Sequence, residues 1–211
     1  MGPAIQSLPN ENPNSGVDEH KLNDLNLKSS LDFDSWTSLI SEFEQKYSDD
    51  IEKICLVYDS FLAEFPLCYG YWRRYAGHKM RLCTVDKVIE VFERAVESAT
   101  YSVHLWVDYC TFCVSAFEDP SDVRRVFKRG TSIVGKDFLC HLLWDKYIEY
   151  EFYQQHWPFL AHVYIQSLKF PTKRLHYYYD RCKDFVEIMP SLVAINAIIF
   201  SGRAITRLSS P

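Results

Sequence analysis

Residues 144–151 read WDKYIEYE, and this stretch decides the fold of the chain. Trp144 and Tyr147 stand three residues apart, a spacing that places two large side chains on one face of an α-helix. A similar phrase, a tryptophan followed three positions later by a second large apolar residue, occurs at three earlier places in the sequence. Residues 144–151 therefore indicate one copy of a repeat.

The other copies give the repeat its period. Four of the five tryptophans lie at intervals of 36, 34 and 38 residues, and a further aromatic residue follows each of them by 20 to 22 residues, within an amphipathic run. Two helical phrases in a unit of about 34 residues predict a helix–turn–helix. The signature residues of the four units are Trp36, Leu39 and Tyr58; Trp72, Tyr75 and Phe92; Trp106, Tyr109 and Phe127; and Trp144, Tyr147 and Tyr164.

Capping residues and prolines agree with this partition. Pro66 and Pro171 follow the second phrase of the first and fourth units, where a helix is expected to end. Helix starts are indicated by residues that cap or open a helix, namely Asp34, Thr84, Asp119 followed by Pro120, and Pro158. Each unit is therefore predicted to be a pair of helices joined by a short turn.

The chain is expected to have three parts. Residues 1–33 are rich in Pro, Asn, Ser and acidic side chains and predict a disordered acidic tail. Residues 34–189 hold the repeats, including a partial fifth unit in which Leu175 and Tyr178 take the signature positions. Residues 190–211 show no repeat phrase and are either a tail or a capping helix.

Short helix pairs cannot bury their apolar faces alone, so they stack. The predicted fold is all-α: an α-solenoid of antiparallel helix pairs, similar to tetratricopeptide superhelices, with about four to five repeats.

Composition limits the functions that the chain can have. A net charge of -5 is unlike that of a strongly basic nucleic-acid-binding domain, and only 7 Gly residues leave little material for a phosphate-binding loop. No signal peptide or membrane-spanning run is apparent. No catalytic motif appears, so neither catalytic residues nor a cofactor are predicted, and the chain is expected not to be an enzyme.

Two features of the sequence are candidates for a metal-binding or partner-binding site. Cys110 and Cys113 form the single Cys-x-x-Cys motif, but a zinc site needs four ligands, so core packing of reduced thiols is favoured and no metal site is predicted. Four basic residues of the third unit share one helical face and form a candidate contact for RNA phosphate or an acidic protein partner, with a solvated face as the alternative; they are Arg124, Arg125, Lys128 and Arg129.

The repeat resembles a known family. Residues 144–151 are similar to the first helix of the half-a-tetratricopeptide (HAT) repeat, and residues 91–95, VFERA, to its second helix. Lys79 and Cys113 replace the glutamate that the repeat places after Tyr75 and Tyr109, which puts single helix–helix contacts in doubt. A tetratricopeptide repeat fits less well, because no glycine directly follows the residue three positions after each tryptophan.

Within HAT proteins, three phrases resemble the N-terminal repeats of the pre-mRNA-processing factor 39 family: residues 65–72, 101–106 and 142–147. The resemblance implies a nuclear scaffold of the splicing machinery, associated with protein partners of the U1 small nuclear ribonucleoprotein and with 5′ splice-site selection. Family dimerisation involves C-terminal repeats that are not found here, so a dimer is not carried over, and the chain is expected to be a fragment or short form. The alternatives are a HAT factor of mRNA 3′-end processing and a tetratricopeptide-like peptide-binding adaptor.

Overall fold

The computed structural model describes residues 32–188, and within this range it has nine α-helices and no β-strand. The predicted all-α fold of paired helices is confirmed. The predictions for the two ends of the chain concern residues that lie outside the described range, apart from the few that border it. The helices are α2 (Phe33–Lys46), α3 (Ile51–Glu64), α4 (Tyr69–Leu82), α5 (Val85–Ser98), α6 (Val103–Ala116), α7 (Pro120–Val134), α8 (His141–Tyr153), α9 (Trp157–Ser167) and α10 (Leu175–Ile188).

The helix ends follow local sequence. Asp119 caps α7 by accepting a hydrogen bond from the backbone N–H of Ser121, and Pro120 opens the helix, as predicted. The start of α2 was predicted two residues too late: Asp32, rather than Asp34, is the N-cap, because its side chain accepts from the N–H of Ser35 at 2.9 Å. Both aspartates are suitable N-cap residues in the sequence. The backbone conformation decides which of them accepts the capping hydrogen bond.

The described residues fall into two compact units. The first contains α2 and α3, which pack against each other through apolar side chains of both helices. Trp36 of α2 lies edge-on to Phe61 of α3, with 6.1 Å between ring centroids. Tyr58 of α3 donates a hydrogen bond to Glu44 of α2. This pair therefore has a core of its own.

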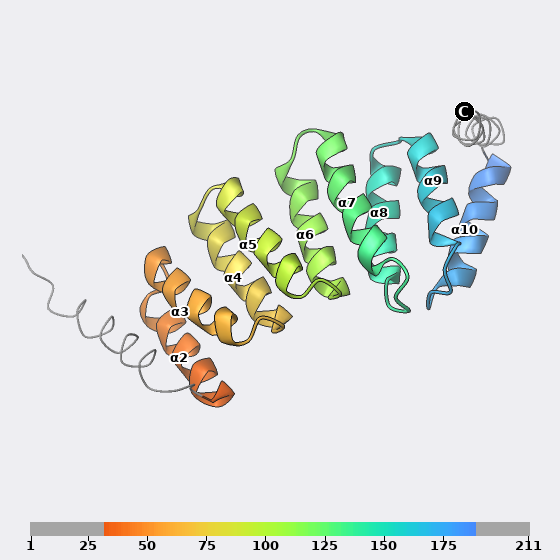
Figure 1. Ribbon diagram of the computed structural model, residues 1–211. Coiled ribbons are helices and arrows are strands. Elements are labelled where there is room, and N and C mark those ends of the chain that lie inside the picture. The colour runs from red at the N-terminus through yellow and green to blue at the C-terminus, as the bar shows by residue number, and fades with distance from the viewer. Residues whose placement is uncertain (1–31, 189–211) are drawn as a thin grey trace, which may run out of the picture. The chain divides into compact units, whose positions relative to one another are not determined.

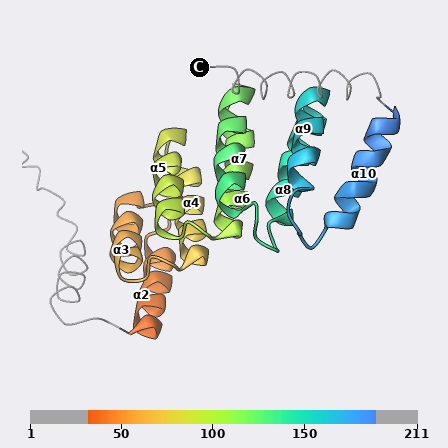
Figure 2. The same ribbon diagram turned by 45° about the vertical axis from the view of Figure 1, so that its right-hand side comes forward.

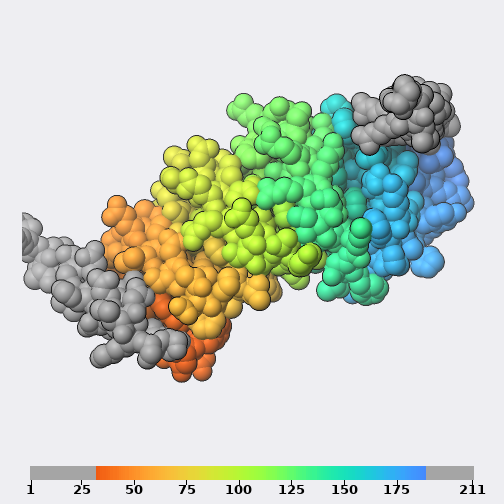
Figure 3. Space-filling view, viewed as in Figure 1, coloured from red at the N-terminus to blue at the C-terminus, as the bar shows by residue number. Residues whose placement is uncertain are grey.

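The second unit contains α4 to α10, which follow one another in chain order (Figures 1 and 2). The first helices of successive pairs touch, since α6 contacts both α4 and α8, and each second helix contacts the first helix that follows it. In the space-filling view the side chains of α5 to α9 close the gaps that are visible between the ribbons (Figure 3). Stacked pairs thus build a continuous core, as a repeat protein requires.

Stacked aromatic rings connect successive pairs of the second unit. Phe92 of α5 stacks on Tyr109 of α6, with 5.2 Å between centroids and 10° between planes. Phe127 of α7 stacks on Tyr147 of α8 in the same way, at 4.5 Å and 2°. The second signature aromatic of one pair therefore packs on the signature tyrosine of the next, and we call this contact the repeat joint.

Three of the four signature tryptophans fix the turns that lead into their helices. The indole N–H of Trp72 donates to the carbonyl of Pro66, and that of Trp106 to the carbonyl of Thr100, both at 2.8 Å. Trp144 makes the corresponding bond to Gly135 at 3.2 Å. Buried indole N–H groups usually have such partners, so these three tryptophans both fill the core and set the direction of the chain entering their helices. Trp36 differs, because its buried indole N–H has no hydrogen-bond partner within the described residues.

Helix α10 begins at Leu175, where the partial fifth unit was expected. Its signature residue Tyr178 is fully buried and is the one residue of α10 in that class. None of the helices within residues 32–188 is both long enough and apolar enough to cross a bilayer.

Candidate functional site

The twelve signature residues lie in the core, each with no more than 7% of its surface exposed. They form the repeat joints and the packing around them, so they support a surface and do not themselves form one. The helices that they hold in register are what position any exposed site. Functional side chains are therefore expected on the faces that the signature residues leave exposed.

The four basic residues of α7 do not act alike. At about 100° per residue they cover an arc of roughly 140° around the helix, with Arg124 and Arg129 at its two edges and Arg125 and Lys128 in the middle. Both edge residues reach carboxylates on neighbouring helices, Arg124 as a buried side chain and Arg129 as a partly exposed one, whereas the middle residues are exposed and reach no other described helix by an ion pair. The structure thus divides the predicted cluster into two interhelical ion pairs and two solvent-facing cations.

The edge residues tie α7 to its neighbours. Arg124 makes two hydrogen bonds to the fully buried carboxylate of Glu151 in α8, at 2.8 and 2.9 Å, and its guanidinium lies 4.0 Å from the ring centroid of Phe159. Arg129 binds Glu93 of α5 with both terminal nitrogens. This contact lowers the pKa of the Glu93 carboxyl. Both arginines are therefore occupied within the protein.

The middle residues remain candidates for a partner contact. Arg125 is exposed and makes a surface ion pair with Asp122 of the same helix at 3.1 Å. Lys128 is also exposed, with its ammonium 6.0 Å from the ring centroid of Phe159. Exposed ion pairs of this kind are weak, so they compete little with an anionic partner.

The Cys-x-x-Cys motif lies inside the core. Cys110 and Cys113 are buried in α6, and burial raises the pKa of the Cys113 thiol to about 12 and that of Cys110 well above its usual value. Thiols in this state are poor nucleophiles and metal ligands, because both roles need the thiolate. Within residues 32–188, no three histidine, cysteine or carboxylate side chains are arranged to hold a metal ion.

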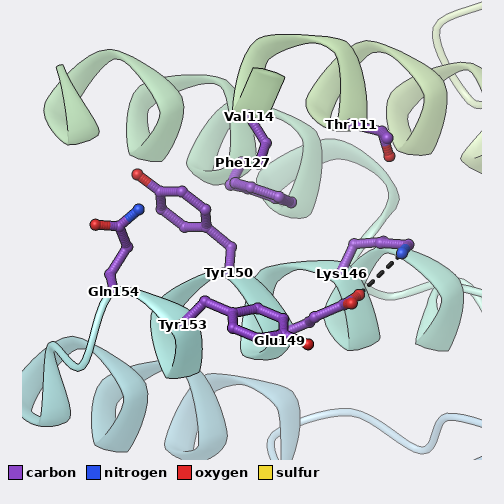
Figure 4. A pocket seen from close by; sticks show the side chains of 8 residues that line it. All are labelled: Thr111, Val114, Phe127, Lys146, Glu149, Tyr150, Tyr153 and Gln154. Carbon is purple, nitrogen blue, oxygen red and sulfur yellow. Dashed lines mark hydrogen bonds and ion pairs between the residues drawn. The ribbon is translucent and has the colours of Figure 1, made fainter. Parts of the chain in front are cut away.

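A groove of about 350 Å³ lies on the face formed by α6 and α8 (Figure 4). We call it the α6–α8 groove. Phe127 of α7, the ring that stacks on Tyr147, lies deep in it. Its other lining residues come from two helices: Thr111 and Val114 of α6, and Lys146, Glu149, Tyr150, Tyr153 and Gln154 of α8.

The groove is mainly apolar but open. Val114 is 42% exposed and Tyr153 is 74% exposed, so two large apolar side chains at its rim face solvent. Lys146 and Glu149 form an ion pair at 2.8 Å along one edge (Figure 4). An exposed apolar surface with a polar edge is typical of a place where a protein binds another molecule.

A second cavity of about 280 Å³ lies on the other side of α8, toward α10. It shares Glu149 and Tyr153 with the α6–α8 groove. Tyr177 lies in it with two arginines near its ring, the guanidinium carbons of Arg174 and Arg181 being 5.6 and 5.9 Å from the centroid. The exposed side of α8 is therefore flanked by two adjacent cavities.

Sequence reasoning missed the α6–α8 groove. Residues 146, 149, 150, 153 and 154 are spaced by three and one, the pattern of a single helical face, and this pattern was available in the sequence. The pattern alone did not predict a groove, because Tyr147 and Glu151 of the same helix belong to the repeat phrase and indicate only its buried face. Exposure of Tyr153 depends on how α6 packs beside α8.

Comparison with known proteins identifies the repeat. The family described as PRP39 N-terminal HAT repeat matches residues 20–184. Pre-mRNA-processing factor 39-2 of Arabidopsis thaliana is 57% identical over 177 residues, which cover 83% of this chain and 17% of that protein. Pre-mRNA-processing factor 39 of Schizosaccharomyces pombe is 31% identical, over 76% of this chain and 27% of its own length.

A more distant relative is the U1 small nuclear ribonucleoprotein component PRP42 of Saccharomyces cerevisiae, 26% identical over 47% of this chain and 18% of that protein. This chain thus spans less than a third of the length of each of these relatives. The match to the family extends over most of the repeats, and the paired helices of the structure fit a HAT-repeat fold. The chain belongs to the PRP39 family of HAT-repeat proteins.

Proposed function

We propose that this chain is a scaffold segment of the nuclear pre-mRNA splicing machinery, which binds protein partners of the U1 small nuclear ribonucleoprotein and supports 5′ splice-site selection. Family membership supports the proposal, since relatives are named pre-mRNA-processing factors and one is named a U1 component. The chain covers only a part of these relatives, so the proposal concerns the contribution of this segment.

The observation that carries a binding role is the α6–α8 groove. It combines an exposed apolar lining with helices that are locked from behind by the Phe127–Tyr147 stack and the Arg124–Glu151 ion pair. A rigid surface loses little conformational entropy when a partner binds, which favours affinity. Such an arrangement serves recognition, and no bond chemistry is part of the proposal.

Affinity purification tests the proposal. The tagged 211-residue chain is incubated with Arabidopsis nuclear extract, and the bound proteins are identified by mass spectrometry against a tag-only control. Enrichment of U1 particle proteins is the expected result. Enrichment of cleavage and polyadenylation factors instead would favour the 3′-end-processing alternative. Enrichment of chaperones would favour the adaptor alternative.

A second candidate contact is the exposed pair Arg125 and Lys128. Reversing both charges (Arg125→Glu with Lys128→Glu) is expected to weaken binding of an anionic partner without unfolding the chain, because neither side chain is buried. A phosphate contact would also weaken steeply as salt rises. A matched control is Lys183→Glu, an exposed lysine on α10. Unaltered binding at low salt would exclude this pair.

A further inference from the structure

We infer that the α6–α8 groove binds one apolar face of an α-helix supplied by a protein partner. The inference rests on the proposed protein-binding function and adds to it the position of the site and the chemistry of its occupant. Three properties of the groove lead to this conclusion: its length along two neighbouring helices, the lack of a row of free backbone hydrogen-bonding groups in its walls, and the pairing of its charges.

The groove follows the helices that form it. Its α8 lining begins at Lys146 and ends at Gln154, eight residues later, which corresponds to roughly 12 Å along a helix axis. Thr111 and Val114 form the opposite wall and are three residues apart on α6. The site is therefore an elongated trough about two helical turns long, and an occupant helix could lie along it with two or three side chains inside.

Backbone hydrogen bonding separates a helix from an extended peptide. Apart from the Lys146–Glu149 pair, the polar side-chain atoms of the lining are those of Thr111, Tyr150, Tyr153 and Gln154, and Figure 4 shows Thr111 and Gln154 toward opposite ends. The two walls are helices, whose backbone groups are paired within each helix, so the groove offers no row of backbone donors and acceptors. An extended segment would leave backbone N–H and C=O groups facing the apolar lining unpaired, which is costly. A helix satisfies its own backbone groups and presents only side chains, as amphipathic helices do in apolar grooves.

Charge separates a protein partner from RNA. Lys146 is the one cation among the described residues of the lining, and Glu149 already neutralises it at 2.8 Å. RNA affinity depends on cations that can neutralise phosphates. The groove therefore favours an apolar occupant without a negative charge.

The rim residues supply the expected energetic centre. Phe127 is already buried and offers a closed apolar floor, whereas Val114 and Tyr153 still have exposed surface to lose. Aromatic side chains that become buried in a pocket contribute a large share of interface affinity. We therefore expect Tyr153 to contribute most of the binding energy and Val114 to contribute the next largest part.

Selection from a peptide library tests the inference. A displayed library of random 16-residue peptides is selected on the 211-residue chain, and the recovered peptides are compared with a 20-nucleotide polyuridine RNA as a second probe. We expect the peptides to share apolar residues at i, i+3 or i+4, and i+7, and to gain helicity on binding, while the RNA is unaffected by substitutions in the groove. A proline-rich or otherwise extended consensus, or failure to recover any peptide that binds this groove, would overturn the inference.

Matched substitutions locate the binding. Tyr153→Ser and Val114→Gln are each expected to weaken the selected peptides at least about tenfold. Tyr101→Ser and Val85→Gln are their controls, because Tyr101 is 82% exposed and Val85 is 43% exposed, similar to their counterparts, and both lie away from the groove. All four sites are partly exposed, so folding is retained, and circular dichroism verifies this. Equal loss in controls and groove variants would contradict the proposed site.

The outcome can be separated from that of the proposed function. If Tyr153→Ser releases the selected peptides but the unaltered chain recovers no U1 proteins from nuclear extract, the groove inference stands and the splicing proposal fails. If U1 proteins are recovered equally by the unaltered chain and by Tyr153→Ser, and the selected peptides also bind both equally, the splicing proposal stands and the groove inference fails.

Discussion

Helix α8 is joined to α7 by a repeat joint and to α10 by a contact of another kind, and the two differ in how they are held together. On the α7 side, Phe127 stacks flat on Tyr147, and Arg124 makes a two-bond ion pair with the buried Glu151. On the α10 side, the Tyr178 hydroxyl lies within hydrogen-bonding distance of two acceptors, Asp145 Oδ1 at 2.7 Å and the His141 carbonyl at 3.0 Å. Tyr178 is the one buried residue that α10 contributes.

The difference shows that the repeat signature determines where a helix docks, and the residues around it determine how firmly. Tyr147 and Tyr178 occupy equivalent positions and are both buried. Around Tyr147, however, α8 buries five further residues, whereas α10 buries none besides Tyr178. Similar signatures therefore coexist with unequal burial, from which we expect unequal stability, and the following substitutions test this from the largest effect to the smallest.

Replacing Trp106 by alanine is expected to destabilise the second unit most. Its ring is buried in α6, lies beside Gly130 of α7 and donates a hydrogen bond to Thr100, so the substitution costs about 3–5 kcal/mol. Thermal unfolding followed by circular dichroism measures the loss. Trp157→Ala, which removes a partly exposed tryptophan outside the repeat register, should lower the melting temperature less. An unchanged melting temperature for Trp106→Ala would contradict the role of the signature.

Glu151→Ala tests the joint on the α7 side. It leaves Arg124 buried without its partner, and removing one member of a buried ion pair costs about 3 kcal/mol or more. Urea unfolding gives the free-energy difference. Glu90→Ala breaks the exposed surface pair with Lys87 and should change stability by less than about 1 kcal/mol. Equal effects of the two substitutions would mean that burial of the pair is unimportant.

Tyr178→Phe tests the contact on the α10 side. It removes a hydroxyl that interacts with two acceptors and should cost about 1–2 kcal/mol. Because α10 buries so little else, we expect the amides of α10 to exchange faster in hydrogen-exchange measurements while those of α6 are unaffected. Tyr179→Phe, at an exposed neighbouring position, is the control and should leave both rates unchanged. Uniformly faster exchange in α6 and α10 would indicate a single cooperative unit.

The ion pair between Glu93 and Arg129 predicts that the stability of the folded chain depends on pH. Arg129 and Tyr109 lower the pKa of the Glu93 carboxyl, so the ion pair stabilises the folded chain above the usual glutamate pKa. This stabilisation is lost as the pH falls through the lowered pKa. We therefore expect the stability difference between the natural chain and Glu93→Gln to shrink on acidification from pH 6 to pH 3. A difference that stays constant over this range would contradict the assignment.

The smallest expected effect is a gain in stability at the end of α8, which both contacts share. Gln155 has φ of 54°, the left-handed conformation in which glycine is usual after a helix, and the N–H of His156 returns to the Glu151 carbonyl at 3.3 Å. Gln155→Gly should stabilise the chain by about 0.5–1 kcal/mol. Gln154→Gly, at the preceding residue with φ of -71°, should destabilise it. Opposite signs for the two variants are the decisive measurement.

Much of the fold could be predicted because the repeat carries its own period. Trp36, Trp72, Trp106 and Trp144 are large enough, and regularly enough spaced, to mark equivalent helices. Prolines such as Pro120 and Pro158 then place helix starts to within a residue or two. The start near Asp34 was displaced because two aspartates competed for one cap.

The surface was harder to predict than the core. A helical projection of α7 places its four basic residues on one arc, but it contains no information about Glu93 and Glu151, which lie 36 and 27 residues away from Arg129 and Arg124. The α6–α8 groove likewise depends on packing between helices that are about one repeat apart in sequence. Local periodicity specifies a face, and tertiary contacts decide what that face meets.

Phe127 is part of both a repeat joint and the α6–α8 groove, because its ring stacks on Tyr147 and also lines the groove. A molecule bound in the groove would therefore contact Phe127, the ring through which the third and fourth helix pairs pack on each other. Occupancy should tighten the alignment of those pairs, so that recognition at one point stiffens the neighbouring stretch of the array. In such a scaffold, binding of one partner in the groove would change the affinity of a neighbouring site through the stiffness of the helices between them.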